Sequence, residues 1–521
     1  MSELYSYHVF LFPFKWEIWQ GEKHTKTPLS GRTLLKDIQK QLPVPYWEPF
    51  TFVPQIKQGY NTYNEYSYFY DFARDVLCLD EKQRNIGALQ FEYKGVCPTS
   101  TYNISFAKKD YQLSIQKILL NLYDDGIGVL SFHLENRTYK DFDDILKIND
   151  SGRRLYPQFL GTDNNRLTQI PKGSFLANSI KLQDVDWIGG TEIIEDFSHY
   201  DQQEQVVEMP FVLPNHFAKL LGQRFVTMYQ HHLKGDVLIH PILDDRMFVL
   251  SYAINQSLLE DLAKIAEKDD SDSANEEEEA KEAKKQWYEY VFVDGSGSTC
   301  HSETMLNRHL EAATYDRWLG YKADGKYAGH LFGISRYSMV VLATDSWFPK
   351  NVLIHHVRYI YFQMVLLCLV QRASLINFSG EVARISERLS SDFRKLDAER
   401  PHIAKLYLSY IKFVNRIYFR EISPQEQGIE LYDQLQQQMR IRQDVEDLGR
   451  EIQELNTFSD TIQQGHLTFI AGKFLPASLV AGILGINAEI GKPTEKFWIG
   501  VAIIAIVFFI SDGIIRLLQK K

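Results

Sequence analysis

Two stretches near the end of the chain decide how its fold is read: LTFIAGKFLPASLVAGILGI, from Leu467 to Ile486, and FWIGVAIIAIVFFISDGIIRLL, from Phe497 to Leu518. Each is about as long as a bilayer core requires of a helix that rises roughly 1.5 Å per residue. Neither has the polar face of a surface helix in a soluble protein. We expect two transmembrane helices at 467–518; the alternative is a pair of buried helices in a soluble domain.

The loop from Asn487 to Lys496 is too short to hold a domain, so the two helices form a hairpin with both ends on one side of the membrane. The N-terminus has neither the basic segment nor the long apolar segment of a signal peptide. Basic residues at the chain end favour a cytoplasmic C-terminus, although two lysines in the loop weaken this signal. We expect a multi-pass protein of the cell inner membrane with both termini in the cytoplasm. A shorter apolar run, Tyr359 to Val370, is expected to be a buried helix.

Composition excludes several classes of function. The chain of 521 residues has a net charge of −10, which argues against direct nucleic-acid binding. Its four cysteines form no CxxC pair and so indicate neither a disulfide framework nor a zinc site. The run from Asp294 to Thr299 is rich in glycine and serine but lacks the lysine of a phosphate-binding P-loop. We expect a protein that is not an enzyme.

The soluble part is expected to begin with an α/β (α+β) cytosolic domain over residues 1–258. Aromatic and β-branched residues predict strands at Tyr7–Trp16, Gly126–Leu134 and Arg246–Tyr252. Ser114–Tyr123 and Phe217–His231 are interpreted as helices.

A change in composition follows. Residues 259–286 are expected to be an acidic low-complexity linker, because Glu267–Lys285 reads EKDDSDSANEEEEAKEAKK; an exposed helix is the alternative. Residues 287–424 are expected to form a second cytosolic part. It would hold strands at Trp287–Val293 and His330–Ala343 and then helices, broken near Ser379-Gly380, at Pro401 and at Pro424.

Residues 425–466 are expected to form one long stalk helix. Apolar residues recur with the spacing of a heptad seam, at Ile441, Val445, Leu448, Ile452, Leu455 and Ile462. Such a seam fits an oligomeric stalk that continues into the first membrane helix. An intramolecular helical bundle would produce the same pattern.

The end of the first apolar stretch resembles the CorA family of divalent-cation channels. The residues that carry the resemblance are Gly485, Ile486 and Asn487, where the family has Gly-Met-Asn, together with Pro493, Glu495 and Trp498 in and after the loop. The resemblance implies a CorA-like homopentamer, in which five first helices line a pore. A ring of Asn487 side chains would then meet a hydrated cation such as Mg²⁺.

One residue type conflicts with a magnesium channel. Lys473, Val480 and Asn487 are spaced by seven, so they share one helix face and are expected to line the pore together. A ring of lysines would repel divalent cations. Alternatively, Lys473 extends to the membrane interface.

Two functions follow from the resemblance. One is a Mg²⁺/Co²⁺-type transporter, in which Mg²⁺ also binds the cytosolic part. The other is a membrane effector like the CorA branch of type III CRISPR antiviral defence. There, the resemblance implies a small nucleotide ligand, a cyclic oligoadenylate or an S-adenosylmethionine–nucleotide conjugate. The expected partners are the lipid bilayer, this ligand and further copies of the chain, and we prefer the effector interpretation.

One segment of the cytosolic domain is a candidate for the ligand site. The turn signal Asn149–Gly152 precedes Arg153 and Arg154, and Tyr156 follows. Two guanidinium groups on a loop could hold phosphates while the tyrosine stacks on a base. Ordinary surface arginines are the alternative.

Overall fold

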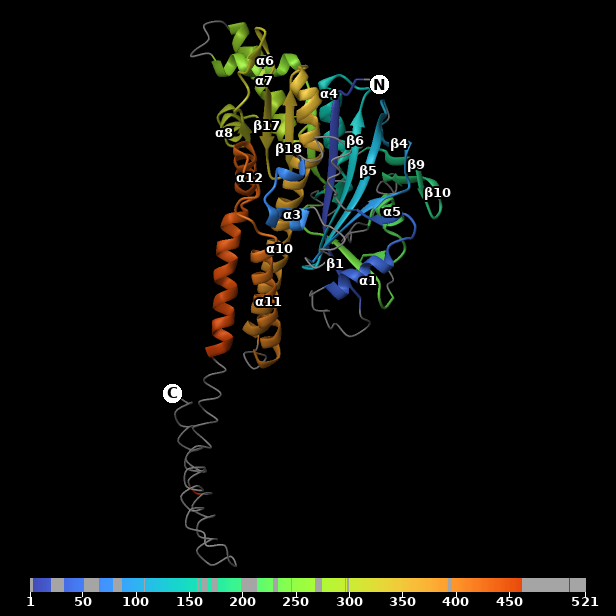
Figure 1. Cartoon of the computed structure of the whole chain (residues 1–521), viewed down its shortest axis with the longest axis vertical. Coiled ribbons are helices and arrows are strands. Elements are labelled where there is room, and N and C mark those ends of the chain that lie inside the picture. Colours follow the sequence, from blue (N-terminus) through green and yellow to red (C-terminus); the bar gives the residue numbers. More distant parts are fainter. Residues whose placement is uncertain are drawn as a thin grey trace, which may run out of the picture. The chain divides into compact units, whose positions relative to one another are not determined.

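The structure is a computed structural model of the chain. It describes residues 3–19, 32–50, 65–77, 87–106, 108–156, 159–161, 167–169, 177–197, 213–227, 233–244, 246–267, 274–295, 297, 299–391, 396–461 and 506 (Figure 1). The two expected membrane helices therefore lie outside the described residues, except for Ile506.

A single large sheet organises the first part of the chain. Its main path runs β10-β9-β4-β5-β6-β1-β13-β18-β17-β14, and β2, β3, β11 and β12 pair beside this path (Figure 1). The strands are β1 (Ser6–Ile18), β2 (Trp47–Pro49), β3 (Ala88–Tyr93), β4 (Val96–Ser105), β5 (Tyr111–Tyr123), β6 (Ile127–Asn136), β9 (Ser179–Trp187), β10 (Gly190–Asp196), β11 (Phe225–Val226), β12 (Val237–Pro241), β13 (Phe248–Ile254), β14 (Thr314–Tyr315), β17 (His330–Ile334) and β18 (Ser338–Ala343). Two small hairpins, β7 (Phe159–Gly161) with β8 (Leu167–Gln169) and β15 (Lys322–Ala323) with β16 (Lys326–Tyr327), stand apart from it.

The helices follow the same chain order. They are α1 (Arg32–Gln41), α3 (Asp71–Leu77), α4 (Phe142–Gly152), α5 (Asn215–Leu221), α6 (Gln256–Glu267), α7 (Ala274–Phe292), α8 (Glu303–Ala313), the π-helical η4 (Pro349–Leu353), α9 (Ile354–His356), the π-helical η5 (Val357–Tyr361), α10 (Phe362–Ser391), α11 (Leu396–Arg416), α12 (Glu426–Gln438) and an unlabelled helix over residues 441–461.

Strand β1 lies at the centre of the sheet, paired antiparallel to β6 and β13. Its side chains alternate between two buried faces, which explains its nearly continuous apolar sequence. Phe10, Phe12 and Phe14 join the core beneath α1, α4 and α5. On the other face, the hydroxyl of Tyr7 donates to Nδ1 of His133 at 2.8 Å, and the His133 ring meets Phe362 of α10 edge-on.

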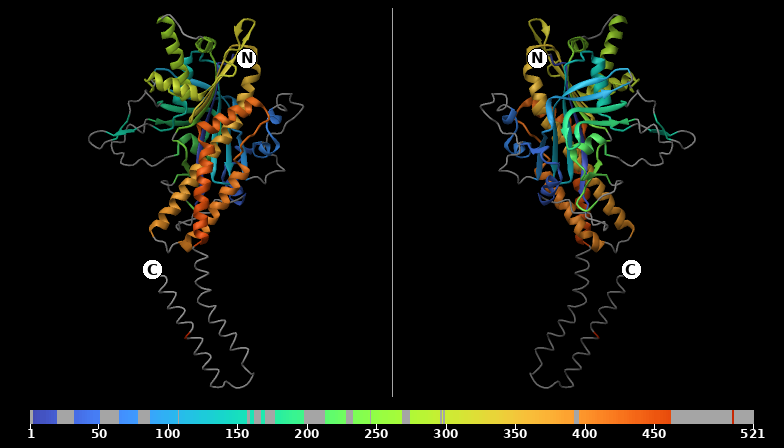
Figure 2. Two further views of the ribbon diagram at one scale, coloured as in Figure 1. Left: turned by 90° about the vertical axis from the view of Figure 1, so that its left-hand side faces the viewer. Right: turned by 90° about the vertical axis from the view of Figure 1, so that its right-hand side faces the viewer.

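Helix α10 runs along this second face of the sheet (Figure 2). The hydroxyl of Ser374 donates to the carboxylate of Asp125, in the turn between β5 and β6. Just before α10, the carbonyl oxygen of Pro349 accepts a 3.0 Å hydrogen bond from the hydroxyl of Tyr252. The sheet thus has a helical layer on each face.

The mixed α/β class of the soluble part is confirmed, and strands occur where Tyr7–Trp16, Gly126–Leu134, Arg246–Tyr252 and His330–Ala343 predicted them. Three segment predictions are wrong. Ser114–Tyr123 belongs to strand β5, because it pairs on both sides with other strands. Of the second predicted helix, Phe217–His231, only 217–221 is helical among the described residues, as part of α5. The predicted strand Trp287–Val293 instead forms the end of helix α7 and the turn after it.

The boundary expected at residue 258 does not divide the sheet. Strand β13 pairs in parallel with β18, which comes from the second expected part, so one sheet includes both. The expected linker 259–286 begins inside α6, where Leu258, Leu259 and Leu262 are buried. The acidic run then enters α7, where Glu278, Glu279, Lys281 and Glu282 are exposed, in agreement with the exposed-helix alternative. Its glutamate, alanine and lysine residues are strong helix formers.

The helical region has fewer breaks than expected. Helix α10 continues through Ser379-Gly380, and Pro401 lies inside α11, whereas Pro424 does precede α12. The expected stalk is broken between Gln438 and Ile441, where Arg440 adopts a left-handed φ of +58°. A chain reverses or bends at such a residue instead of continuing the helix.

The heptad seam is buried within the chain. Ile441, Val445, Leu448 and Ile452 are each less than 9% exposed, and Ile462 lies outside the described residues. The intramolecular alternative therefore describes this seam. Leu455 is only half-buried. Contact between copies must therefore use Leu455 or other surfaces, because the four buried side chains are already covered.

The chain divides into two compact units. One comprises residues 1–380 and 409–446; the other comprises 381–408 and 447–521. In the second unit, the buried apolar side chains include those of Ile385, Ile403 and Ile452. Its Arg388 and Glu399 form a salt bridge, with Nε 2.7 Å from Oε1.

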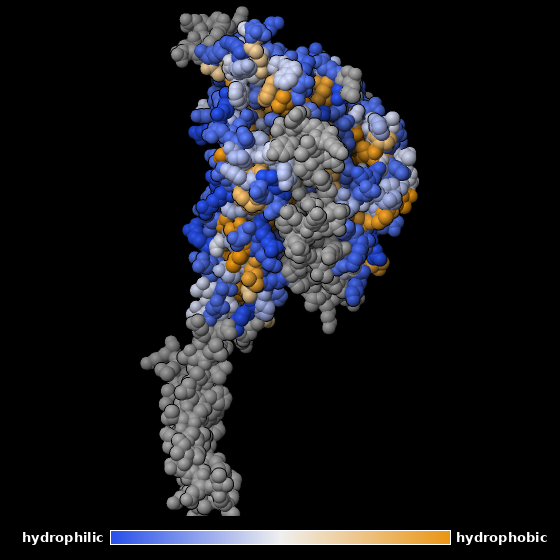
Figure 3. All heavy atoms as spheres, in the orientation of Figure 1, coloured by the Kyte–Doolittle hydropathy of each residue, from blue (hydrophilic) through white to orange (hydrophobic). Residues whose placement is uncertain are grey.

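One described helix, Pro349–Leu389, is long and apolar enough to cross a membrane. However, 67% of its most apolar window is buried inside the chain. This agrees with a buried helix at Tyr359–Val370. Hydrophilic side chains cover most of the described surface seen in Figure 3, interrupted by small apolar patches.

Candidate functional site

The pore and signature residues lie outside the described part of the chain. These residues are Lys473, Val480, Gly485, Ile486, Asn487 and Glu495. Their roles remain predictions from the sequence. The described part does include Arg153, Arg154 and Tyr156, the expected ligand-binding segment.

Arg153 and Arg154 are not on an exposed loop. The expected turn at 149–152 is the last turn of α4, and Arg153 caps the end of that helix. The two arginines are only 3% and 5% exposed. Tyr156 packs against the core beneath α4 and α5. The prediction of an exposed loop here is therefore wrong, and so is the alternative of ordinary surface arginines, because the helix carries both side chains into the interior. The ligand-binding role of these residues stays a prediction.

Asp150 holds Arg154 in place. Its carboxylate is fully buried and accepts hydrogen bonds from Nε and Nη2 of Arg154, at 3.1 and 2.7 Å. The two residues are four apart on α4, the spacing at which side chains on a helix meet. A buried charge requires such a partner, so this pair is structural.

Arg153 is less completely satisfied. Its Nη2 donates to the carbonyl oxygen of Val293 at 3.0 Å, and Asp150 is 3.9 Å away. Its Nε and Nη1 have no hydrogen-bonding partner among the described residues. Burial lowers the pKa of Arg153 to about 10, a shift to which Arg246 and Arg154 add. Positive charge is therefore crowded at this end of α4.

The crowding extends to a pocket next to α4. Arg154 and Arg246 form an antiparallel β-bridge, and the amide of Met247 donates to the carbonyl oxygen of Arg153 at 2.9 Å. The pocket, which we call the arginine pocket, encloses about 290 Å³ of space that is partly open to solvent. It is lined by Pro13, Leu243, Asp244, Arg246, Met247, Phe248, Arg336, Tyr337, Leu369 and Arg372.

Three separate elements supply the arginines. Arg246 precedes β13, Arg336 lies in the turn between β17 and β18, and Arg372 lies on α10. The turn is fixed to the sheet, because the amide of Val249 donates to the carbonyl oxygen of Tyr337 at 3.0 Å. The sequence separates these residues widely; the pairing of β13 with β18 and the packing of α10 against the turn bring them together.

The lining of the pocket places one carboxylate, that of Asp244, beside these three arginines. Nη2 of Arg246 donates to Oδ2 of Asp244 at 2.8 Å, and its guanidinium carbon lies 5.5 Å from the centre of the Tyr337 ring. Arg336 is exposed. Three guanidinium groups thus face one carboxylate within the lining.

Arg372 shows the effect of this crowding. Burial lowers its pKa, and the nearby guanidinium of Arg336 lowers it further. The carboxylates of Asp444 and Asp244 raise the pKa of Arg372 and so oppose part of this shift. Guanidinium groups present paired N–H donors that match phosphate and carboxylate oxygens. The arginine pocket can therefore bind an anion, and the exposed Tyr337 ring beside it can stack on a planar group.

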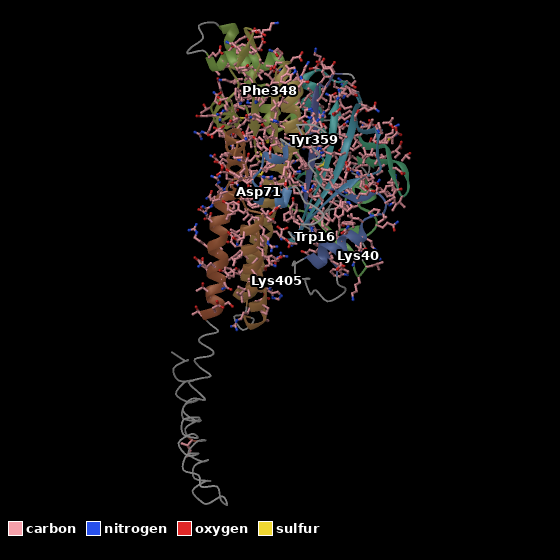
Figure 4. All side chains as sticks on the ribbon, viewed as in Figure 1. Trp16, Lys40, Asp71, Phe348, Tyr359 and Lys405 are labelled. Atoms are coloured by element: carbon pink, nitrogen blue, oxygen red, sulfur yellow. The ribbon has the colours of Figure 1, made fainter. Side chains whose placement is uncertain are left out.

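A second pocket has balanced charges. Its lining includes Lys117, Arg358 and Tyr359, the last labelled in Figure 4, together with Glu65. Arg358 pairs with Glu135, and Nζ of Lys117 lies 4.8 Å from the centre of the Tyr359 ring. Burial lowers the pKa of Lys117 to about 8 and raises that of Glu65 to about 7. Glu65 in the lining and Glu135, which pairs with Arg358 from outside it, offset the two cations. The arginine pocket has three cations in its lining, so it is the better anion site.

Within the described residues, no group of three or more histidine, cysteine, aspartate or glutamate side chains is placed to hold a metal ion.

Comparison with known proteins adds one distant similarity. No family model and no curated protein matches the chain. Three solved chains match, among them the CorA magnesium transporter from Methanocaldococcus jannaschii. That transporter is 13% identical, over 54% of this chain and 94% of its own, with a TM-score of 0.13. A TM-score this low establishes neither a shared fold nor a shared activity.

Proposed function

We propose that this protein is a membrane pore, multi-pass in the inner membrane, that opens when its cytosolic part binds a phosphate-bearing nucleotide. In this proposal it acts as an effector in type III CRISPR antiviral defence rather than as an enzyme. The ligand is an adenylate-type second messenger, a cyclic oligoadenylate or an S-adenosylmethionine–nucleotide conjugate. Opening would disrupt the membrane.

The arginine pocket is the observation that supports ligand control. The whole chain has a net charge of −10, yet three arginines gather in this pocket around the single carboxylate of Asp244. Guanidinium groups gathered from separate elements around one pocket are typical of a site that binds phosphate or carboxylate groups. The ligand's phosphate would bind the guanidinium groups and its base would stack on Tyr337.

The membrane part of the proposal rests on the sequence. Two apolar stretches, 467–486 and 497–518, follow the described helix 441–461. Two helices per chain cannot enclose a pore alone, so several copies must combine, and the likeness of Gly485 and Asn487 to the CorA signature favours five. The buried heptad seam means that these copies would meet through the membrane helices and through surfaces other than Leu448 and Ile452.

A divalent-cation transporter is the second candidate. It is favoured by the same Gly485 and Asn487, whereas Lys473 on the same predicted helix face disfavours it. In that case the pore would carry Mg²⁺ without a nucleotide.

Native mass spectrometry and a liposome assay test the proposal together. We expect a pentamer in detergent, and dye release from proteoliposomes only after a cyclic oligoadenylate or the S-adenosylmethionine–nucleotide conjugate is added. A monomer at micromolar concentration, or release that is the same with and without both ligands, would refute it.

A further inference from the structure

A bulge in strand β5 turns Lys117 toward the start of α10. The pairing of β5 with β6 shifts register between Ile115 and Lys117. Ile115 and Ile118 consequently both belong to the core beneath α1, α4 and α5, although residues three apart face opposite sides of a regular strand. Lys117 is paired with His133, whose ring meets Phe362 on the other face of the sheet. Bulges that re-aim one side chain are frequent next to functional sites.

The ammonium group of Lys117 lies among aromatic rings in the second pocket, which we call the lysine pocket. Its Nζ is 4.8 Å from the centre of the Tyr359 ring and 5.9 Å from that of Phe362. Phe50 and Phe69 complete the aromatic part of the lining. The pocket encloses about 410 Å³ of space that is partly open to solvent, and Tyr359 is 37% exposed. A small planar molecule can therefore reach the amine between these rings.

The lining also leaves polar atoms for a ligand. Oε1 of Gln363 and Nε of Arg358 are buried and have no hydrogen-bonding partner among the described residues. The guanidinium of Arg358 pairs with Glu135 through Nη2 instead. Buried polar atoms in proteins are normally satisfied, so an unmatched acceptor and donor in one lining indicate a ligand with polar groups of its own. Arg358 and Tyr359 come from the π-helical η5, a kind of turn that is frequent at functional sites.

The surroundings of Lys117 favour a reactive amine. Burial lowers the pKa of Lys117 to about 8, and Arg358 acts in the same direction, whereas Glu92 and Glu65 oppose the shift. Part of the side chain is therefore unprotonated near neutral pH, unlike an ordinary lysine with a pKa of about 10.4. Lysines that attack carbonyl groups are activated in this way, by an apolar pocket or by a neighbouring cation.

We propose that Lys117 captures a small aromatic aldehyde as an imine in the lysine pocket. The amine nitrogen attacks the carbonyl carbon and forms a C=N bond, while the carbonyl oxygen leaves as water with the two amine hydrogens. The aromatic side chains stack on the ring of the ligand, and Oε1 of Gln363 accepts a hydrogen bond from a hydroxyl on it. The imine is a bound state and requires no further reactant.

Glu65 is placed to relay protons in this step. Its carboxyl group shares the lining with Lys117 and is only 7% exposed. Burial raises the pKa of Glu65 to about 7, so both of its protonation states are populated near neutral pH. The inference is independent of the proposed pore, and either can fail without the other.

Borohydride trapping on the full-length protein in detergent tests the proposal, with salicylaldehyde as the probe. Reduction converts the imine to a stable amine that peptide mass spectrometry locates. Lys109 is the matched control in the same molecule, because its Nζ also lies 5.4 and 5.7 Å from the centres of two rings, those of Tyr111 and Tyr139, but is half exposed and paired with Asp144. Near pH 7, Lys117 should be labelled roughly tenfold or more faster than Lys109. The rate at Lys117 should rise as the pH approaches its pKa of about 8.

Three comparisons decide the outcome. Lys117→Arg keeps the charge and should abolish the fast adduct without changing the labelling of Lys109. In urea, Lys117 and Lys109 should be labelled equally, because the advantage depends on the fold. Propanal, which has no ring, should label Lys117 roughly threefold or more slowly than salicylaldehyde does. Labelling of Lys117 no faster than that of Lys109 in the folded protein, or an advantage that persists in urea, would overturn the reactive lysine; equal rates with propanal would overturn the aromatic ligand.

Discussion

Nη1 of Arg372 donates a 3.0 Å hydrogen bond to the carbonyl oxygen of Arg336, so helix α10 is fixed to the turn between β17 and β18. This bond explains how two guanidinium groups from separate elements come to line one pocket. It uses a backbone acceptor, which leaves the charge of Arg372 without a carboxylate at salt-bridge distance among the described residues.

Arg336→Gln and Arg372→Gln should each weaken phosphate binding. A hydrogen bond to a charged group contributes about 1.5–3 kcal/mol, so each variant should lose roughly tenfold or more in pyrophosphate affinity by calorimetry. Arg450→Gln, which removes an exposed arginine paired with Asp447, is the matched control and should bind normally. Equal affinities in all three variants would remove the arginine pocket from consideration.

The Asp150–Arg154 pair should be important for stability. Both side chains are buried, so Asp150→Asn leaves a guanidinium group without its counter-charge. Removing one partner of a buried pair typically costs about 3–5 kcal/mol in the free energy of unfolding. Urea unfolding, followed by the fluorescence of buried tryptophans such as Trp16, would measure the loss (Figure 4).

The control for this experiment is Asp447→Asn, which breaks a surface pair in which the aspartate side chain is 45% exposed. Such pairs contribute at most about 1 kcal/mol. Similar losses in the two variants would contradict a special role for Asp150.

The sheet should lose stability in acid through His8. Its side chain is fully buried; Nδ1 donates to Oδ1 of Asn149 at 2.7 Å, and Nε2 accepts from Ser6, so the ring is neutral. Burial lowers the pKa of His8 from 6.5 to about 4, although the bond to Asn149 opposes the shift. The unfolded chain therefore binds the proton more readily than the folded chain between pH 6.5 and 4.

This contribution is present in full above pH 6.5 and is lost as the pH falls toward 4. The shift corresponds to a loss on the order of 3 kcal/mol in the free energy of unfolding. His8→Gln should flatten this part of the pH profile in urea unfolding. An unchanged slope would show that His8 is not responsible.

Cysteine accessibility tests whether α10 belongs to the soluble core. Cys368 on α10 is buried, and burial raises its pKa, so it should resist maleimide in the folded protein. Cys97 is exposed, and hydrogen bonds from Ser100 and Thr99 lower its pKa, so it should react quickly. After denaturation both should react. Rapid labelling of Cys368 in the native protein would mean that α10 is not packed as described.

The sequence predicted some elements well because their signals are local. β1 is rich in aromatic and apolar residues, and both of its faces are buried over most of its length. β5 was misread as a helix, because Ile115, Ile118 and Leu122 also fit a helical spacing and only pairing with β4 and β6 decides for a strand. The aromatic residues near Trp287 favour a strand by composition. The helix-forming acidic run before them instead extends through them, so that both belong to helix α7.

The ligand site shows why sequence reasoning was incomplete. Two adjacent arginines, Arg153 and Arg154, suggest a phosphate-binding site. Asp150, four residues before Arg154, is the signal in the sequence that Arg154 is paired. The arginines that do line a pocket, Arg246, Arg336 and Arg372, lie in three elements, and no local pattern connects them. Their grouping depends on the parallel pairing of β13 with β18 and on the position of α10.

Ion flux through proteoliposomes tests the central claim most directly. Wild-type protein should carry almost no Mg²⁺ without nucleotide. Dye release should begin when a cyclic oligoadenylate or the S-adenosylmethionine–nucleotide conjugate is added, and the double variant Arg336→Gln/Arg372→Gln should abolish that response. Lys473→Ile should raise Mg²⁺ flux through the opened pore, because a ring of positive charge is removed. Rapid Mg²⁺ flux through wild type without nucleotide, unchanged by Lys473→Ile, would contradict the account and identify an ordinary metal channel.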